Sequence, residues 1–305
     1  MKNEGKFDVI IIGGSYAGLS AAMALGRSLR KVLIIDGGKP CNRQTPHSHN
    51  FITHDGETPA NISKKAKVQV LNYPTVNCIT DHVLQVEGEN NDFTIRTQSG
   101  GFYQGAKLIF ATGMKDDFPA IPGFSDCWGI SVLHCPYCHG YEVRHEKIAI
   151  ISNGSDAFEM VKLISNWSPK LTLITNGSST LSEDQALKLQ ELAILVIEKE
   201  IKEITHENGY VKDIVFSDNS SHETVAIFAR PKISQHDTLP QQLSCELTES
   251  GLIKVDDFQR TTVAGVYAAG DCASLFRSVS SAVAAGNKAG ALVNKELIDE
   301  YFWRN

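Results

Sequence analysis

The 305-residue sequence lacks several features that mark large classes of proteins. It has no excess of basic side chains, because 29 lysines and arginines stand against 35 aspartates and glutamates and give a formal net charge of −6. It also has no basic block to attract a phosphate backbone and no apolar run long enough to cross a bilayer. The short polar lead before the first apolar strand lacks the pattern of a secretory signal. We therefore expect a soluble, cytoplasmic protein that contacts neither nucleic acid nor membrane.

The sequence is also poor in clustered cysteines, which excludes a disulfide scaffold of the small secreted type. Seven cysteines occur, at positions 41, 78, 127, 135, 138, 245 and 272. Only Cys135 and Cys138 are close in sequence, in the stretch HCPYCHGYE. Taken alone, this stretch fits a redox pair, half of a zinc site or a catalytic thiol with its base. Zinc needs four ligands and the chain has no second CxxC, so we expect no metal site. We also expect no purely structural disulfide, because a lone CxxC in a reducing compartment is typically catalytic or metal-binding.

The first forty residues predict a nucleotide-binding βαβ unit. The run FDVIII at 7–12 is typical of a strand buried on both faces of a parallel sheet, and KVLII at 31–35 predicts the next strand. Between them, GGSYAGLSAAMALGRSL predicts a tight turn and a helix. In this pattern Gly13 makes the turn, Gly18 lets helix and strand approach, and Asp36 accepts from a ribose hydroxyl.

A second, related unit begins with the strand KIAIIS, followed by the helical stretch NGSDAFEMVKLISNW and the strand KLTLIT. Its register reads Ser152, Gly154 and Ala157, so the glycine of the tight turn is missing. The second strand ends in TNG at 175–177, which offers neither an acid for a ribose nor an arginine for a 2′-phosphate. We therefore expect the fold of this unit to persist without a normal NADPH site.

Two further strands complete the predicted organisation. LIFATG at 108–113 predicts a strand with a tight end, and TTVAGVYAAGDC at 261–272 predicts another that precedes a long helix of small residues. The expected fold is α/β, with two Rossmann-like dinucleotide-binding domains made of parallel sheets and flanking helices. The second domain, 117–245, carries the CxxC and is inserted into the first, 1–116 plus 246–305.

Four motifs in this order resemble the thioredoxin-reductase-like flavoproteins, two-domain members of the pyridine nucleotide-disulfide oxidoreductase family. They are IIGGSYAGLSAA with the acid at 36, the ATG at 111–113, HCPYCHG, and VYAAGDC near the end. The resemblance spans nearly the whole chain and implies an FAD-binding first domain, an NAD(P)-binding-like second domain and a homodimer. It implies cofactor contacts for ten residues: Gly13, Gly14, Ser15, Gly18, Asp36, Ala111, Thr112, Gly113, Gly270 and Asp271.

By the same resemblance, Cys135 and Cys138 are the catalytic redox pair, with Cys138 next to the flavin and Cys135 facing the partner's sulfur. The implied partner is a thioredoxin-like protein or a small dithiol or disulfide. His139 stands where such reductases usually carry an aspartate as proton donor. Because histidine titrates in the physiological range, we expect His139 to be the catalytic acid–base residue, with His134 as the alternative.

The departures from the family pattern leave the electron donor open. Ser15 replaces the middle glycine of the first fingerprint, and the Arg-Gln pair expected at the last helix is replaced by Val279 and Ser280. The His-Arg-Arg cluster of NADPH-dependent relatives is missing. Proline and tyrosine between the cysteines, with histidine behind them, resemble the branch of fungal dithiol oxidases of the gliotoxin type, in which oxygen reoxidises the flavin. Some other relatives without the NADPH motifs take electrons from ferredoxin.

The sequence therefore predicts an FAD-dependent thiol–disulfide oxidoreductase for which NADPH is a doubtful cofactor. The alternatives are an NADPH-dependent thioredoxin reductase and an oxygen-dependent dithiol oxidase that produces hydrogen peroxide. An alternative of another class is a flavin redox sensor that exchanges electrons rarely.

Three histidines, His47, His49 and His54, form a second cluster without an assigned role. They belong either to a polar surface loop or to a loop beside the flavin in which one histidine positions substrate. Tyr137, between the two cysteines, is placed to present a flat face to a bulky partner. We expect five other aromatic and cysteine side chains to serve in packing alone: Cys41, Phe124, Trp128, Tyr141 and Cys272.

Overall fold

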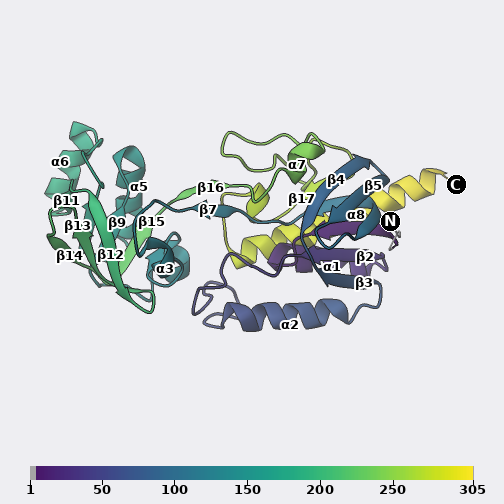
Figure 1. Ribbon diagram of the computed structural model, residues 1–305, viewed down its shortest axis with the longest axis horizontal. Coiled ribbons are helices and arrows are strands. Elements are labelled where there is room, and N and C mark those ends of the chain that lie inside the picture. Colours follow the sequence, from purple (N-terminus) through teal and green to yellow (C-terminus); the bar gives the residue numbers. More distant parts are fainter. Residues whose placement is uncertain (1–4, 305) are drawn as a thin grey trace. The chain divides into compact units, whose positions relative to one another are not determined.

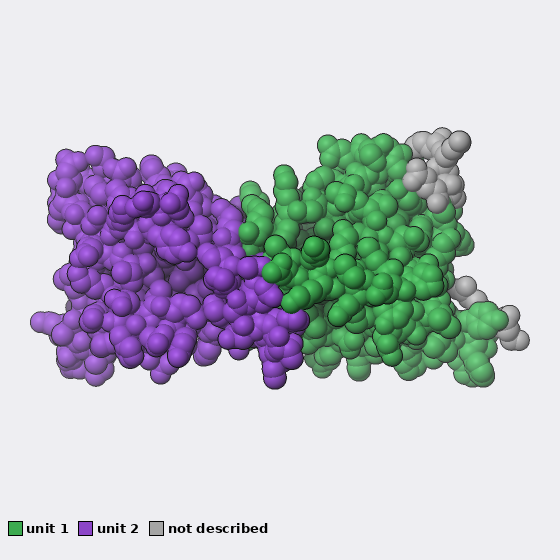
Figure 2. All heavy atoms as spheres, turned by 90° about the horizontal axis from the view of Figure 1, so that it is seen from below, with its two compact units in different colours: residues 1–43, 60–115, 233–305 green, residues 44–59, 116–232 purple. Residues whose placement is uncertain are grey.

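A computed structural model of the chain describes residues 5–304, which form two compact units. Unit 1 comprises residues 1–43, 60–115 and 233–305, and unit 2 comprises residues 44–59 and 116–232, as coloured in Figure 2. The chain passes from one unit to the other at 43/44, at 59/60, within β7 (Lys115–Asp117) and within β16 (Lys232–Ser234), and β7 pairs with β16.

Unit 1 contains a seven-stranded sheet in the order β3-β2-β1-β6-β5-β4, with β17 also paired to β6. The strands β3, β2, β1, β6 and β17 run parallel, whereas β4 and β5 are antiparallel. The elements of this unit are β1 (Lys6–Ile12), α1 (Tyr16–Arg27), β2 (Val32–Asp36), α2 (Pro59–Leu71), β3 (Val76–Thr80), β4 (Val83–Glu89), β5 (Asp92–Thr97), β6 (Phe102–Phe110), α7 (Leu239–Gln242), β17 (Val266–Ala268), the 3₁₀ turn η1 (Asp271–Ala273) and α8 (Val279–Arg304).

The helices α1 and α8 pack against each other along small residues. In Figure 1, α8 is the long yellow helix and α1 is violet. A Cβ atom at Gly286 of α8 would lie only 2.0 Å from the carbonyl oxygen of Ala17, and one at Gly290 would lie 2.5 Å from that of Ala21. The small-residue pattern of the last helix is therefore what lets the two backbones approach.

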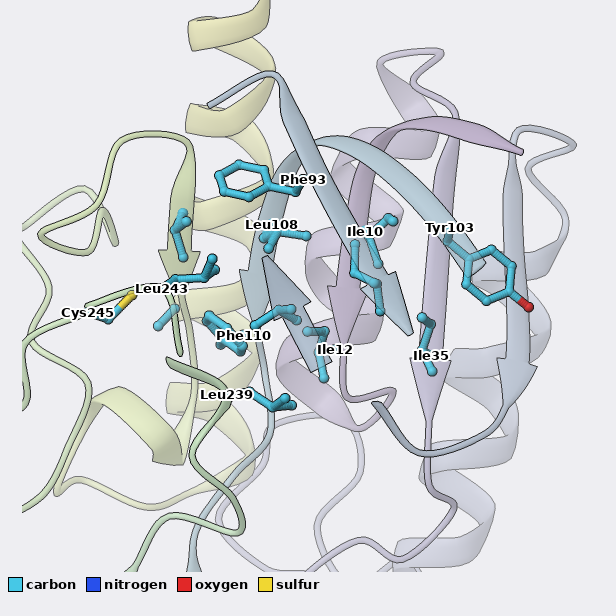
Figure 3. Packing of buried hydrophobic residues seen from close by; sticks show 14 of the residues in the cluster. Ile10, Ile12, Ile35, Phe93, Tyr103, Leu108, Phe110, Leu239, Leu243 and Cys245 are labelled. Atoms are coloured by element: carbon cyan, nitrogen blue, oxygen red, sulfur yellow. The ribbon is translucent and has the colours of Figure 1, made fainter. Parts of the chain in front are cut away.

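Buried side chains from both ends of the chain form the core beside this sheet. Figure 3 shows Ile10 and Ile12 of β1 with Leu108 and Phe110 of β6. The segment around α7 joins them through the set Leu239, Leu243 and Cys245. This packing is the reason that the unit resumes at residue 233, whereas the sequence-based boundary was 245/246.

Unit 2 contains a five-stranded parallel sheet in the order β11-β10-β9-β15-β8 and an antiparallel sheet of β12, β13 and β14. Its elements are α3 (Phe124–Cys127), β8 (Val132–Leu133), α4 (Pro136–His139), β9 (Ile148–Ile151), α5 (Gly154–Ile164), β10 (Leu171–Ile174), α6 (Glu183–Glu191), β11 (Leu195–Ile197), β12 (Ile201–Glu207), β13 (Tyr210–Phe216), β14 (Ser221–Glu223) and β15 (Ala226–Ala229). The predicted α/β class with two Rossmann-like domains is confirmed.

Segment 44–59, which carries the three clustered histidines, groups with unit 2 rather than with unit 1. The sequence-based division had left it in the first domain. Close contacts explain the difference, since Thr45 lies against Gly129 and the His49 ring lies beside the CxxC turn. Within residues 5–304, no helix is both long enough and apolar enough to span a membrane.

Candidate functional site

The turn after β1 has the geometry that a dinucleotide-binding fingerprint requires. Gly13 has φ +105°, and a Cβ atom there would lie 2.2 Å from the carbonyl oxygen of Ala111. A Cβ atom at Gly18 would lie 1.9 Å from the carbonyl oxygen of Gly13. Both positions therefore need glycine, as the motif predicts, because any side chain would displace backbone.

The N-terminus of α1 is open to a ligand. Ser15, the helix N-cap, has φ −90° and ψ −158°, a conformation that any residue adopts, and its side chain makes no capping hydrogen bond. Serine in place of glycine therefore causes no backbone strain here. The carboxylate of Asp36 accepts a hydrogen bond from the Gly14 N–H at 3.0 Å, which fixes the acid at the end of β2. These residues fit the adenosine-pyrophosphate half of FAD, with the helix dipole facing the phosphates.

Two more segments meet at the carboxyl edge of the same sheet. Ala111 follows β6, and its N–H donates to the carbonyl oxygen of Ile12 at 2.8 Å. Ala269 follows β17, and its N–H donates to the carbonyl oxygen of Phe110 at 2.9 Å. Thr112 and Gly113 continue the first segment, and Gly270 and Asp271 continue the second. The predicted cofactor residues thus follow neighbouring strand ends, the usual place for a ligand in an open α/β sheet.

Arg277, which the sequence had not singled out, forms an ion pair with Asp271 at 3.2 Å. This ion pair fixes the carboxylate of Asp271, a residue for which the resemblance implies a cofactor contact. The adjacent Cys272 is buried, and desolvation raises the pKa of its thiol to about 11. Cys272 is therefore a core residue, as predicted, whereas the prediction for Cys41 was wrong because Cys41 is exposed.

In unit 2, a disulfide joins Cys135 and Cys138 at the short helix α4. Cys135 is the N-cap, Pro136 opens the helix, and the Cα atoms of the two cysteines are 5.3 Å apart. The backbone N–H groups of Cys138 and His139 both donate to the carbonyl oxygen of Cys135 at 3.2 Å. This turn holds the two sulfurs in bonding geometry at the start of a helix, where the local dipole favours a thiolate.

His139 directly follows the second cysteine on the same turn. Its pKa is lowered from 6.5 to about 4, mainly by burial and further by the nearby His134 and His49. The imidazole is therefore neutral at physiological pH, and the expectation that His139 titrates in the physiological range was wrong because burial disfavours its charged form. His134 stacks on Trp128 with ring centroids 5.7 Å apart, and Trp128 stacks on Phe124 at 5.9 Å. This stack confirms the packing role predicted for both aromatic residues.

Of the three clustered histidines, His49 lies nearest to the CxxC turn. Its ring meets that of His139 edge-on, at a centroid distance of 6.5 Å. His49 Nε2 is 3.6 Å from Glu142 Oε1, and His49 Nδ1 is 3.7 Å from Asp55 Oδ1. His47 is exposed and its Nδ1 is 3.0 Å from the carbonyl oxygen of Gly56. No short-range pattern indicates this arrangement, because about ninety residues separate the two segments.

The face beside the dithiol carries exposed aromatic side chains. Tyr137 is 57% exposed and packs edge-on against Trp167 at 5.5 Å. Tyr141 is 65% exposed, so its predicted packing role was wrong, and the Arg144 guanidinium lies over its ring at 4.0 Å. Rigid aromatic rings next to a reactive pair are suited to bind an apolar or ring-shaped partner group.

The turn after β9, which corresponds to the dinucleotide-type turn of unit 1, is held by hydrogen bonds of the Asn153 side chain. Asn153, the N-cap of α5, accepts hydrogen bonds from the N–H groups of Gly154 and Thr180, both at 2.8 Å. It also donates to the carbonyl oxygen of Ser178 at 2.8 Å. In unit 1 the corresponding place is held by Gly14, which has no side chain. Asn153 therefore occupies the first N–H group of α5, that of Gly154, and ties the loop at Thr180 to the same turn.

The residues that follow β10 are also held by hydrogen bonds. The Thr175 hydroxyl donates to the carbonyl oxygen of Gly177 at 2.6 Å, and Asn176 Oδ1 accepts from the N–H of Ile201 at 2.7 Å. The Glu198 carboxylate accepts from the N–H of Ser179 at 2.8 Å. A carboxylate near this corner repels the 2′-phosphate of NADPH rather than binding it. Within residues 5–304, no group of three or more His, Cys, Asp or Glu side chains is placed to hold a metal ion.

Comparison with known proteins gives consistent matches over the whole length. Residues 7–288 match the family described as pyridine nucleotide-disulphide oxidoreductase. The curated protein named thioredoxin reductase sirT, from Leptosphaeria maculans, is 32% identical over 306 residues, which cover 94% of this chain and 93% of that protein.

Two solved structures show the same fold over nearly the full chain. An oxidoreductase from Agrobacterium tumefaciens has a TM-score of 0.90 and 36% identity, covering 96% of this chain and 99% of its own. The structure titled HlmI has a TM-score of 0.93 and 31% identity, covering 100% of this chain and 96% of its own.

Proposed function

Because the chain belongs to the pyridine nucleotide-disulphide oxidoreductase family, we propose that it is an FAD-dependent enzyme exchanging electrons with a dithiol or disulfide partner through Cys135 and Cys138. The observation that carries the proposal is the disulfide at the start of α4, directly followed by a neutral, half-buried imidazole at His139. The open fingerprint of unit 1 supports FAD as the cofactor, which supplies a two-electron acceptor for the dithiol when bound.

In the direction of substrate oxidation, a thiolate of the partner attacks the sulfur of Cys135. The bond between Cys135 and Cys138 breaks, and Cys138 leaves as a thiolate. The second thiol of the partner then gives its proton to His139 and attacks the mixed disulfide, which releases Cys135. The partner loses two electrons and the cysteine pair gains them, and in the reducing direction the same steps reverse.

We also propose that unit 2 has no normal NADPH site. The hydrogen bonds of Asn153 and the carboxylate of Glu198 support this, because Asn153 already accepts from the first N–H group of α5 and a carboxylate opposes a 2′-phosphate. The main alternative, an NADPH-dependent thioredoxin reductase, is favoured only by the names of the relatives, such as the sirT protein. Oxygen or a ferredoxin-type protein then remains as the second redox partner.

Anaerobic stopped-flow mixing of the oxidised, FAD-loaded protein with NADPH and with dithiothreitol tests the proposal. We expect dithiothreitol to bleach the flavin absorbance and NADPH at micromolar concentration to leave it unchanged. Fast, saturable bleaching by NADPH would show that unit 2 binds the nucleotide. Admission of air to the dithiol-reduced protein, with hydrogen peroxide measured, then separates an oxygen-dependent oxidase from an enzyme that needs a protein partner.

The variant Cys138→Ser tests the role of the cysteine pair directly. It keeps the size of the side chain and removes the sulfur that passes electrons onward, so dithiol-driven bleaching is expected to fall to the background rate. Turnover at the wild-type level with every dithiol and disulfide tested would contradict the enzymatic role of the pair and favour a flavin redox sensor.

A further inference from the structure

The histidine-bearing segment 44–59 and the CxxC turn together form a chain of titratable side chains within unit 2. The ring of His139 is next to the ring of His49, and His49 lies between the carboxylates of Glu142 and Asp55. His139 and His49 are both partly exposed, and exposure rises towards the carboxylates, since the His49 side chain is 21% exposed, that of Glu142 39% and that of Asp55 70%.

The imidazole of His139 cannot store a proton. Burial and the two neighbouring histidines hold its pKa at about 4, so at neutral pH only about one molecule in a thousand carries the proton. A proton accepted there during dithiol exchange must leave again quickly. His134 is the other histidine that lowers this pKa, but its ring is half-buried and stacked on the buried Trp128.

His49 is the group best placed to receive that proton. Its edge-on contact with His139, at a centroid distance of 6.5 Å, is within the span of one bridging water molecule. The carboxylates of Glu142 and Asp55 lie 3.6 and 3.7 Å from its two ring nitrogens and themselves reach solvent. His47, whose ring centroid is 6.4 Å away, is the remaining titratable group that faces His49 on its own segment.

We propose that His49 carries the proton from His139 to solvent during thiol–disulfide exchange, with Glu142 and Asp55 stabilising its charged form. This role rests on the proposed exchange at Cys135 and Cys138. The proton taken from the partner's second thiol moves to His139 and then to one nitrogen of His49, while the other nitrogen releases a proton towards a carboxylate or water. No electrons move in this step, and His49 acts through His139 as a positioning and proton-transfer residue.

Anaerobic stopped-flow reduction by dithiothreitol, followed by flavin bleaching, tests the proposal in FAD-loaded variants. His49→Gln is expected to slow the reaction about tenfold, because it removes one step of general acid–base transfer. The matched control is His54→Gln on the same segment, whose ring lies beside Phe51 instead, and its rate is expected to stay within about twofold of wild type. Flavin content and melting temperature establish that both variants are folded.

Chemical rescue separates proton transfer from a structural role. In His49→Ala, added imidazole is expected to restore most of the lost rate, whereas His54→Ala is expected not to respond. Glu142→Gln is expected to slow the reaction about threefold, since it removes one partner of the imidazolium, while the exposed Glu146→Gln on the same segment changes nothing.

A His49→Gln rate equal to that of His54→Gln, or a slow His49→Ala rate that imidazole does not restore, would overturn the relay. Either result leaves the proposed function intact provided that wild type reacts with dithiothreitol and Cys138→Ser does not. Failure of wild type itself to react would instead refute the proposed exchange.

Discussion

At the residue scale, the two related turns differ at several matching positions, and the contrast between Gly14 and Asn153 changes their hydrogen bonding. Gly14 in unit 1 leaves the helix N-terminus open, and its N–H binds Asp36. Asn153 in unit 2 turns its side chain back onto the N–H groups of Gly154 and Thr180. The N-terminus of α1 in unit 1 therefore has no side-chain cap, whereas the N-terminus of α5 in unit 2 is capped by the Asn153 side chain.

His139 is the residue whose charge state most affects both chemistry and stability. Its folded pKa of about 4 lies below the ordinary value of 6.5, so between these values the unfolded chain binds a proton that the folded chain does not. Unfolding therefore takes up a proton in this window, and the free energy of unfolding falls as the pH falls. The neutral imidazole that serves as a base is thus also the form that the fold prefers.

The prediction that follows compares wild type with His139→Gln, which is uncharged at every pH. On lowering the pH from about 7 to about 5, wild type is expected to lose about 2 kcal/mol more of its unfolding free energy than the variant. Urea unfolding at both pH values measures the difference, and the histidines that do not interact with His139 cancel because both proteins carry them. Equal losses in the two proteins would mean that burial does not lower the proton affinity of His139.

At the scale of elements, the crossing of α1 and α8 depends on glycine. A helical glycine normally costs about 1 kcal/mol relative to alanine, so replacing it is stabilising where space allows. At Gly286 the space is absent, because a Cβ atom would lie 2.0 Å from the carbonyl oxygen and 2.8 Å from the carbonyl carbon of Ala17. The clash involves backbone, which cannot rotate away as a side chain can.

Gly286→Ala is therefore expected to destabilise unit 1 by about 2 kcal/mol and to lower its melting temperature by about 5 °C. Asn287→Ala is the matched control, since residue 287 is exposed on the same helix and alanine is the better helix former there. Thermal unfolding followed by circular dichroism checks both variants. An increase in stability for Gly286→Ala would show that α8 can shift away from α1 at no cost.

The elements that the sequence predicted best are the buried parallel strands. The runs at 7–12 and 31–35 have few polar residues and clear turn signals, and they correspond to β1 and β2. The stretch 261–272 was predicted as one strand, but only Val266–Ala268 is strand. The antiparallel β4–β5 and β12–β14 were not predicted, because such strands expose one face and carry no long apolar run.

The candidate site could be predicted only where its residues are consecutive. The cysteine pair with His139 and the glycines of the first turn are local motifs, so spacing revealed them. The contact of His49 with Glu142 depends on how a loop folds onto a distant turn, and no short-range pattern encodes it. The ion pair of Asp271 with Arg277 is also set by the turn between them.

At the scale of the whole molecule, the proposal that unit 1 binds FAD and unit 2 does not bind NADPH can be tested directly. A ligand that binds only the folded form stabilises it by RT ln(1 + [L]/Kd), about 4 kcal/mol at a thousandfold excess over Kd. FAD is therefore expected to stabilise unit 1, where the fingerprint is open, and NADPH is expected to stabilise neither unit.

The three tryptophans make the two units distinguishable, because Trp128 and Trp167 belong to unit 2 and Trp303 belongs to unit 1. In the variant Trp303→Phe, tryptophan fluorescence reports on unit 2 alone, while circular dichroism reports on both units. Removal of FAD is expected to lower the transition seen by circular dichroism and to leave the tryptophan transition in place.

Addition of millimolar NADPH to this variant completes the test. The tryptophan transition is expected to keep its midpoint, because Asn153 already accepts from the first N–H group of α5, that of Gly154, and Glu198 opposes a 2′-phosphate. A rise in the tryptophan midpoint with NADPH would show that unit 2 binds the nucleotide despite these contacts. Since the measurement needs no turnover, it distinguishes a missing nucleotide site from a site that binds NADPH but cannot deliver its electrons.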